Sequence, residues 1–410
     1  MSSSGDRELD IVLVGATGFV GRLTAHHLAT RVPAGTRVAL AGRSMVRLAQ
    51  TRAELGAQAQ HWPLIICDVH DQVAVTELAA RARVIVSTVG PYLRHGLPLV
   101  KACAAAGTDY ADLTGETLFV RRSIDACSDL ARANGARIVH SCGFDSVPSD
   151  LGVGLTAAQA AADGQGELTT TVLHVRSMRG GVSGGTIDSL RQQMIEVKTD
   201  PELRSLASDP LALTSLSPAH HHRRHRRGPV DRDPVTGNFQ ARFVMGGFNR
   251  QIVLRSNDIS GGSYGAAFRY REVVDAGPGP RGALTAAAIA AATTGVMAGM
   301  YLAPTRRLLD AVLPDPGEGP SERTRRRGRF LVEVVADTST GARYRTRIGA
   351  QRDPGYGATA VMLGESALSL ANDANVAGRA GVLTPMSALG EALAVRLRAN
   401  QFTVSVSTAD

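Results

Sequence analysis

The first third of the chain alternates short apolar runs with stretches of helical periodicity. Each run ends in a turn rich in Gly, Asp or Pro, and helical spacing of apolar residues follows most of these turns. The runs lie at residues 11–14, 37–41, 64–67, 83–89, 108–111 and 138–140. This βα order is typical of an α/β protein, and it predicts a doubly wound parallel sheet of the Rossmann type in residues 1–147.

The pattern changes after residue 147, where alternating apolar strands follow one another without short helices between them. We expect these strands at residues 169–177, 239–244, 251–254, 264–274, 330–336 and 342–348. They predict a second, α+β domain over residues 148–380 with a mixed or antiparallel sheet. A helix at 384–399 and a strand at 402–406 predict a C-terminal segment, residues 381–410, that packs back on the Rossmann domain.

Two insertions interrupt the second domain, a polar loop at 199–237 and an Ala-rich helix at 282–305. The helix carries no formal charge and contains Gly295-x-x-x-Gly299. Its length is sufficient to span a bilayer, but Ala, Thr, Gly and Pro dominate it, so its hydrophobic drive is weak. Packing in the core or contact with a membrane surface is therefore favoured over spanning.

Composition fits a globular protein of two domains. The chain has 410 residues, of which 44% are hydrophobic and 20% charged. The cysteines form no CxxC pair and the N-terminus lacks a signal-like apolar stretch, so we expect a cytoplasmic protein with peripheral membrane contact as an option. The net charge of +8 is concentrated in residues 220–232 and 323–329. Without aromatic interleaving, these patches do not predict nucleic-acid binding.

The turn after the first strand carries a dinucleotide-binding fingerprint. Gly15 permits the tight turn, Gly18 lets a pyrophosphate approach the backbone, and Gly21 allows the helix to pack on the strand. The pyrophosphate then rests on a helix N-terminus. The turn residues Thr17, Phe19 and Val20 complete the predicted cofactor loop.

The end of the second strand predicts which dinucleotide binds. An NAD site places an acid there, whereas this chain has Arg43 and Ser44, which suit the 2′-phosphate of NADP(H). The alternative is that Arg43 is only a solvated residue of the next helix. Asp68 is expected to border the adenine, and Thr88 and Gly90 to line the crevice at the end of the fourth strand.

Several motifs together resemble the saccharopine dehydrogenase-like family, in its trans-acting enoyl reductase branch. The motifs are Gly15-Ala-Thr-Gly-Phe-Val-Gly21, Gly42-Arg43, Gly90-Pro91-Tyr92, Tyr110-x-Asp112-x-x-Gly115-Glu116, Gly143-Phe-Asp-Ser-Val-Pro-Ser-Asp150, Gly184-Gly185-Thr186, Pro314-x-Pro316-Gly317-x-Gly319-Pro320-Ser321, Asp353-Pro354-Gly355-Tyr356 and Glu365-Ser366-Ala367-Leu368. Their order covers nearly the whole chain. The resemblance implies NADPH-dependent reduction of a carbon–carbon double bond on a thioester-bound acyl chain, in partnership with a polyketide synthase that makes phthiocerol-type envelope lipids.

The resemblance supplies no catalytic residues, so the candidates come from side chains near strand ends. They are Tyr92, His95, Tyr110 and Ser141, with Asp112 and Asp145 as orienting groups. For two of them a structural role competes, since Tyr92 suits packing and His95 suits a helix cap. Two other functions stay open: saccharopine-type chemistry on another substrate, and a non-catalytic NADP-binding protein at a lipid surface.

The histidines of the polar loop invite a metal site. His220, His221, His222 and His225 are surrounded by arginines, which would repel a divalent ion, so we expect no metal. A solvated loop is the simplest interpretation. The functional alternative is a docking patch for an acidic carrier protein that presents the acyl substrate. The sequence leaves the oligomeric state open.

Overall fold

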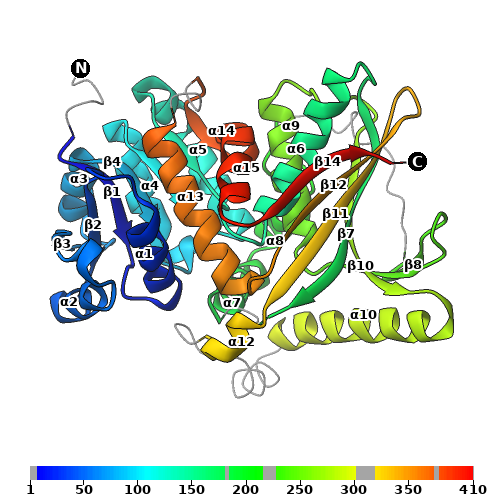
Figure 1. The fold of residues 1–410 in the computed structure, drawn as a ribbon, viewed down its shortest axis with the longest axis horizontal. Coiled ribbons are helices and arrows are strands. Elements are labelled where there is room, and N and C mark those ends of the chain that lie inside the picture. The colour runs from blue at the N-terminus through cyan, green and yellow to red at the C-terminus, as the bar shows by residue number, and fades with distance from the viewer. Residues whose placement is uncertain (1–6, 181–183, 216–227, 302–318, 374–377, 410) are drawn as a thin grey trace.

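The structure is a computed structural model that describes residues 7–180, 184–215, 228–301, 319–373 and 378–409. Within this part, two seven-stranded sheets lie side by side, the first on the left and the second on the right of Figure 1. The first sheet is parallel and the second is mixed. The predicted fold class is therefore confirmed.

The first sheet is the Rossmann sheet expected from the N-terminal pattern. Its strand order is β13 (Gly381–Leu383), β6 (Arg137–Val139), β5 (Asp109–Asp112), β4 (Ala82–Ser87), β1 (Leu9–Val14), β2 (Val38–Gly42) and β3 (Leu64–Ile66). Every pair of neighbours is parallel. The strand at its outer edge, β13, comes from the C-terminal segment.

Both faces of this sheet are buried, as the continuous apolar strands require. On β1, Ile11 and Leu13 join one core cluster, while Val12 and Val14 join another on the opposite face. One face carries α3 (Gln72–Arg81), α4 (Tyr92–Ala106) and α5 (Thr117–Asn134). The other carries α1 (Phe19–Arg31), α2 (Met45–Glu54) and α13 (Thr359–Asn372).

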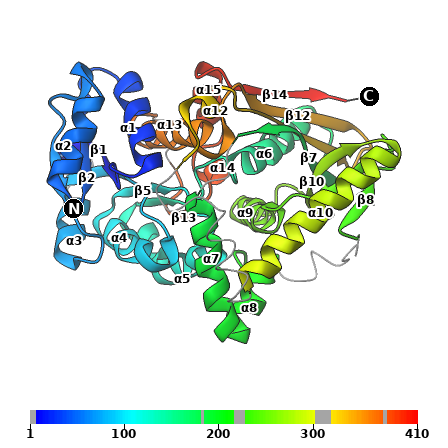
Figure 2. The same ribbon diagram turned by 90° about the horizontal axis from the view of Figure 1, so that it is seen from below.

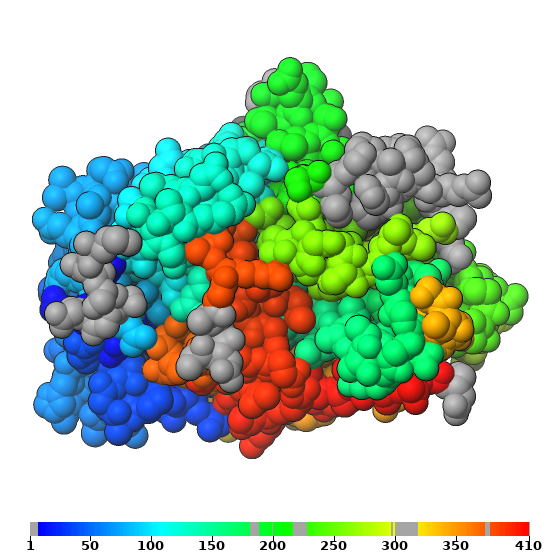
Figure 3. All heavy atoms as spheres, turned by 90° about the horizontal axis from the view of Figure 1, so that it is seen from above, coloured from blue at the N-terminus to red at the C-terminus, as the bar shows by residue number. Residues whose placement is uncertain are grey.

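The helix α13 lies late in the sequence but packs against the first sheet. It contacts α1, β1, β4 and β5. Nearly all its side chains are buried because α15 (Gly390–Ala399) covers it from the second half. Figure 3 shows the C-terminal residues filling the boundary between the two halves. The helix expected at 384–399 is in two pieces, because Gly390 (φ +47°) breaks it after α14 (Pro385–Ala388).

Six of the seven strands of the second sheet come from residues 168–350. Its order is β14 (Thr403–Thr408), β12 (Arg343–Ala350), β11 (Arg329–Thr338), β7 (Leu168–Arg179), β10 (Arg269–Gly277), β9 (Phe239–Arg242) and β8 (Val230–Arg232). β7 and β10 are parallel and the remaining pairs are antiparallel. The helices α6 (Val147–Ala162) and α9 (Gly246–Ile259) pack against it.

Other expected elements also differ from the structure, and the segment expected as a polar loop contains a helix at Pro201–Ser208 and a strand at Val230–Arg232. The run 251–254, predicted as a strand, lies inside α9, because a short apolar run fits a buried helix as well as a strand. The last strand, expected on the Rossmann domain, instead pairs with β12 through Ile348 and Val404. The residue before this strand, Phe402, is buried with its ring 6.2 Å from that of Phe330 of β11.

The Ala-rich segment forms α10 (Gly279–Tyr301), which crosses the second half diagonally in Figure 2. It contacts β8, β9, β10 and α7 (Gly184–Thr199). In the described part of the chain, no helix combines the length and apolarity needed to cross a membrane. The remaining described α-helices of this half are α8 (Pro201–Ser208) and α12 (Glu322–Arg326), and a π-helical turn at Pro354–Ala358 precedes α13. The histidines of the polar loop lie outside the described residues.

Candidate active site

The glycine loop has the backbone geometry that its sequence predicts. Gly15 has φ +84°, and the amide of Gly18 donates to its carbonyl at 3.0 Å. A Cβ on Gly21 would lie 2.1 Å from the Gly15 oxygen, so only glycine fits there. A Cβ on Gly18 would meet nothing closer than that oxygen at 3.4 Å, which leaves its outer face open to a ligand.

The first turn of α1 is the part of the loop that can hold a phosphate. Its N-cap, Gly18, supplies no side-chain acceptor, whereas α2 is capped by Ser44 and α3 by Asp71. At α4 the carboxylate of Glu116 accepts from the first two amides, at 2.9 and 2.7 Å. The free amides and the dipole of α1 therefore fit a dinucleotide pyrophosphate.

The adenosine side of the crevice lies at the ends of β2 and β3. Arg43 is exposed directly after β2, and Ser44 uses its hydroxyl to accept from the Arg47 amide at 3.4 Å. Asp68 follows β3 and accepts from the His70 amide at 3.0 Å. This arrangement offers a cation rather than an acid beside the ribose position, as an NADP site requires.

The other end of the crevice is set by the turn after β4. The Thr88 hydroxyl lies 3.1 Å from the Gly15 carbonyl and ties β4 to the glycine loop. The Gly90–Pro91 peptide is cis. Gly90 faces the second half, because a Cβ there would lie 4.0 Å from the Ser189 hydroxyl of α7. The cofactor loop, Thr88 and Gly90 thus share one edge of the sheet.

Three of the four catalytic candidates are buried inside this edge. The Tyr92 hydroxyl donates to the Ser87 carbonyl at 2.9 Å, and burial raises its pKa well above the ordinary value. Tyr110 is fully buried, with its ring 6.0 Å from that of His140. Ser141 has φ +67° and donates to the Thr114 carbonyl at 2.8 Å. Their geometry favours positioning of the loops over contact with a substrate.

Asp112 organises the turns that follow β5 and β6, as an orienting group would. It accepts from the amides of Thr114 at 3.1 Å and Ser141 at 3.0 Å. His140 lies 2.8 Å from its other oxygen through Nδ1 and 2.8 Å from the Ser123 hydroxyl through Nε2. Since both ring nitrogens are engaged, His140 fixes the carboxylate in place.

The fourth candidate, His95, lies on the adenosine side rather than at the nicotinamide end. Its Nδ1 is 2.7 Å from Nε2 of His70, in the turn after β3. Burial lowers its pKa, and the nearby charges of Arg94 and Arg43 act in the same direction. This position separates it from the other three candidates.

A polar cluster that the sequence did not reveal faces the ends of β5 and β6 from the second half. Glu272 of β10 accepts from the Tyr270 hydroxyl at 2.7 Å and from the Asn249 amide at 3.0 Å, and Asn249 accepts from Ser146 at 2.9 Å. Burial raises the pKa of Glu272, and the nearby charge of Asp145 raises it further. Only Ser146 of this cluster lies in one of the motifs, and its other members come from two further segments, so the sequence did not predict the assembly.

Close contacts join the second half of the chain to the first half at two places, near this cluster and near the glycine loop. A Cβ on Gly115, after β5, would lie 3.3 Å from Met245, and one on Gly246 would lie 3.2 Å from Cβ of Glu272. Near the glycine loop, the ring of Phe19 packs edge-on against that of Tyr356, with the ring centres 4.7 Å apart. The Arg325 guanidinium lies 5.3 Å from the centre of the Phe19 ring. The arginine segment 323–329 therefore lies beside the cofactor loop.

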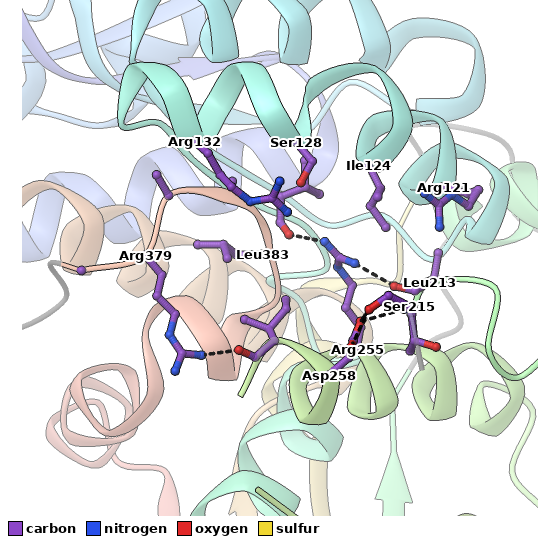
Figure 4. Close-up of a pocket in the computed structure, with 16 residues that line it drawn as sticks. Arg121, Ile124, Ser128, Arg132, Leu213, Ser215, Arg255, Asp258, Arg379 and Leu383 are labelled. Carbon is purple, nitrogen blue, oxygen red and sulfur yellow. Dashed lines mark hydrogen bonds between the residues drawn. The ribbon is translucent and has the colours of Figure 1, made fainter. Parts of the chain in front are cut away.

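A cavity of about 690 Å³ lies toward the opposite edge of the first sheet, between α5, α9 and the chain before β13 (Figure 4). Arg255 extends into the interface there and donates to the Leu213 carbonyl at 2.7 Å and to that of Val382. Burial lowers the pKa of Arg255 to about 10, and Arg121 acts in the same direction. Its bonds to two backbone segments give it a structural role.

Fold and site together define a Rossmann-type, dinucleotide-dependent oxidoreductase, and comparisons with known proteins agree. Residues 11–139 match the saccharopine dehydrogenase NADP binding domain. The chain is 44% identical over 421 residues to a trans-acting enoyl reductase of Mycobacterium ulcerans, with 99% of each chain covered. It is 45% identical over 410 residues to a trans-acting enoyl reductase of Mycobacterium tuberculosis H37Rv, covering 96% of this chain and 97% of that one.

A solved structure shows the same fold. Apo saccharopine dehydrogenase (L-Glu forming) from Saccharomyces cerevisiae superposes with a TM-score of 0.54 at 14% identity, over 98% of this chain and 100% of that chain. The chain thus belongs to the trans-acting enoyl reductase family of saccharopine dehydrogenase-like proteins. Its cofactor is NADP(H), as Arg43 predicted, and the resemblance of its motifs to this family is confirmed.

Proposed function

We propose that the protein is an NADPH-dependent enoyl reductase that acts in trans on a thioester-bound acyl chain. The observation that carries the proposal is the relation to trans-acting enoyl reductases over the whole chain, at 44% identity and 99% coverage. Because the coverage includes both halves, it extends to the part that would hold the substrate. The glycine loop and Arg43 supply the matching cofactor site.

Bound NADPH supplies a hydride from C4 of its nicotinamide to the β-carbon of the substrate. The protein then has to stabilise charge on the thioester oxygen and deliver a proton to the α-carbon. We assign proton delivery to Tyr270 and Glu272, which are as buried as Tyr92 but bond to each other instead of to the backbone, and which adjoin the end of β6 through Asn249 and Ser146. The buried Tyr92, Tyr110 and Ser141 hold the loops around the reacting atoms, and His95 serves the adenosine end.

The substrate we propose is a long acyl chain presented by the carrier protein of a polyketide synthase, in the synthesis of phthiocerol-type lipids. Carrier proteins are usually acidic, and the arginine segment 323–329 adjoins the cofactor loop through Arg325 and Phe19. Opposite charges would steer the encounter and orient the carrier toward the crevice. Contacts to the remote chain would position the reacting carbons.

The test presents carrier-bound enoyl chains together with NADPH deuterated at C4 on either face. We expect one deuteron at the β-carbon of the product from one of the two faces, measured by mass spectrometry. Gly18→Asp serves as the inactive control, and a conventional enoyl reductase confirms that the chain is reducible.

Failure to transfer label, while the wild type binds NADPH and the conventional enzyme reduces the same chains, would overturn the proposal. A non-catalytic NADP-binding protein at a lipid surface would then replace it. Label on a keto acid with an amino donor, and none on enoyl chains, would instead indicate saccharopine-type chemistry.

A further inference from the structure

Two histidines form a bridge above the adenosine side of the crevice. Nε2 of His70 lies 2.7 Å from Nδ1 of His95, and the rings meet edge-on with centroids 4.9 Å apart. His70 belongs to the turn after β3, and His95 to the first turn of α4, which follows β4. Since β1 and β2 lie between β4 and β3, the bridge runs past the carboxyl ends of those two strands.

The bridge is therefore adjacent to the end of β2, where Arg43 begins. β2 and β3 pair with Gly42 opposite Ile66, and the Cys67 amide donates to the Gly42 carbonyl at 3.1 Å. The turn that carries Asp68 and His70 thus continues directly beside Arg43. In a Rossmann crevice this is where the adenosine ribose and its 2′ substituent lie.

The charges around the bridge are mainly positive. Arg43 faces it from the end of β2 and Arg94 from α4, and Asp68 is the acid that opposes them from the turn after β3. Burial, His70 and the two arginines lower the pKa of His95 in the free protein. In this bond one ring donates and the other accepts, and the outward nitrogen of the donating ring is the position that a further proton can occupy.

We propose that the His70–His95 bridge belongs to the subsite for the 2′-phosphate of NADP(H) and takes up one proton when that phosphate binds. The proton comes from solvent and adds to the outward nitrogen of the donating ring, either Nδ1 of His70 or Nε2 of His95. The bond between the rings persists, because the resulting imidazolium still donates to its neutral partner. The new charge pairs with the phosphate, alongside Arg43.

This assignment gives His95 a role in cofactor selection and not in catalysis. NADH lacks the 2′-phosphate, so its binding should not draw a proton to the bridge. The inference rests on the cofactor of the family and is independent of the acyl substrate. Failure of enoyl reduction would therefore leave it intact, and its own failure would leave enoyl reduction intact.

Calorimetric titration at pH 7.5 in two buffers of different ionisation enthalpy counts the protons taken up. We expect the wild type to take up a measurable fraction of one proton with NADPH and close to none with NADH. His95→Asn and His70→Asn should abolish the uptake. His61→Asn is the matched control, because His61 is exposed and precedes β3, whereas His70 follows that strand.

The same titrations between pH 6.5 and 8.0 give the affinity. In the wild type and in His61→Asn, the Kd for NADPH should rise about fivefold to tenfold as pH increases, since protonation is lost. In His95→Asn it should change less than about twofold, as expected when the linked group is absent. Equal proton uptake in the wild type and His95→Asn, or equal uptake with NADPH and NADH, would overturn the proposal.

Discussion

The two sides of the crevice are built in different ways. The cofactor side is made by backbone: three glycines, an uncapped helix and one strand-end arginine, all within residues 15–43. The opposing side is made by side chains, Ser146, Asn249, Tyr270 and Glu272, from three segments that meet only in the fold. The first is recognisable from local sequence, while the second depends on tertiary assembly.

This difference has energetic consequences. On the cofactor side, the uncapped N-terminus of α1 and the side chain of Arg43 can each bind a phosphate group. Substitutions there should therefore change the affinity for the cofactor. On the opposing side, buried carboxyls such as Asp150 and Glu272 are bonded within the protein, so substitutions there should act on stability and on the reaction. The following predictions test that division.

The largest effect is expected from Gly18→Asp. Its Cβ has room, so the chain should fold, but its carboxylate would lie against the pyrophosphate. Affinity for both NADPH and NADH should fall at least about a thousandfold, or about 4 kcal/mol. Fluorescence titration measures this, with Gly18→Ala as the smaller control. Unchanged binding by Gly18→Asp would show that the pyrophosphate lies elsewhere.

The second effect concerns stability on the opposing side. Asp150 is buried and accepts from Ser256 at 2.5 Å and from the Met386 amide at 2.8 Å. Burial raises its pKa from 3.8 to about 6. Because the folded form holds its proton more tightly, Asp150 should lower the free energy of unfolding by about 3 kcal/mol in total as pH rises from below about 3 to above about 7, and by about 2 kcal/mol between about pH 4.5 and 7.

Urea unfolding at pH 4.5 and 7 measures that contribution. Asp150→Asn should remove it, since the amide can donate to Ser256 and still accept from the Met386 amide. Asp129→Asn is the control, because its carboxylate is 99% exposed. The same pH dependence in Asp150→Asn and in the wild type would contradict the assignment.

The third effect is cofactor preference. Arg43→Ala should weaken NADPH binding about tenfold to a hundredfold, or about 1.5–3 kcal/mol, because a charge-assisted contact to phosphate is lost. NADH binding should change little. Calorimetry with both cofactors provides the comparison. An equal loss for NADH would mean that Arg43 does not contact the 2′-phosphate.

The smallest effect on free energy is expected at Tyr270 and Glu272, to which we assigned proton delivery. Glu272→Gln should lower turnover on a carrier-bound enoyl chain about tenfold or more, since a positioned acid contributes at least that much. The Kd for NADPH should stay within about twofold of the wild type. Tyr270→Phe should behave similarly. Weaker NADPH binding with unchanged turnover would show that these residues contribute to cofactor binding and not to the reaction.

Much of the first half was predictable from sequence because its signals are local. Strands alternate with helices there, and Gly15 and Gly21 are needed by backbone geometry that no other residue provides. Residues 251–254 show the limit, since a short apolar run does not distinguish a strand from a buried helix. The pairing of β14 with β12, and the packing of Phe402 near Phe330 beside it, join segments that are distant in sequence and meet only in the fold.

The candidate site divides in the same way. Arg43 was identified because a charge at a strand end has a known ligand, whereas Tyr92 was a candidate for its chemistry with packing as the competing role, and the structure shows it buried. Glu116 appeared in the sequence only as part of a motif. In the structure its carboxylate accepts a hydrogen bond from the Ser189 hydroxyl, 73 positions away in the sequence. Roles that depend on burial or distant contacts need the assembled structure.

The structure of the protein with bound NADP⁺ tests the central claim most directly. The account predicts the 2′-phosphate against Arg43, the pyrophosphate on the first turn of α1, and nicotinamide C4 on the side of Glu272. A cofactor whose nicotinamide points away from Glu272, or whose 2′-phosphate lies away from Arg43, would contradict it.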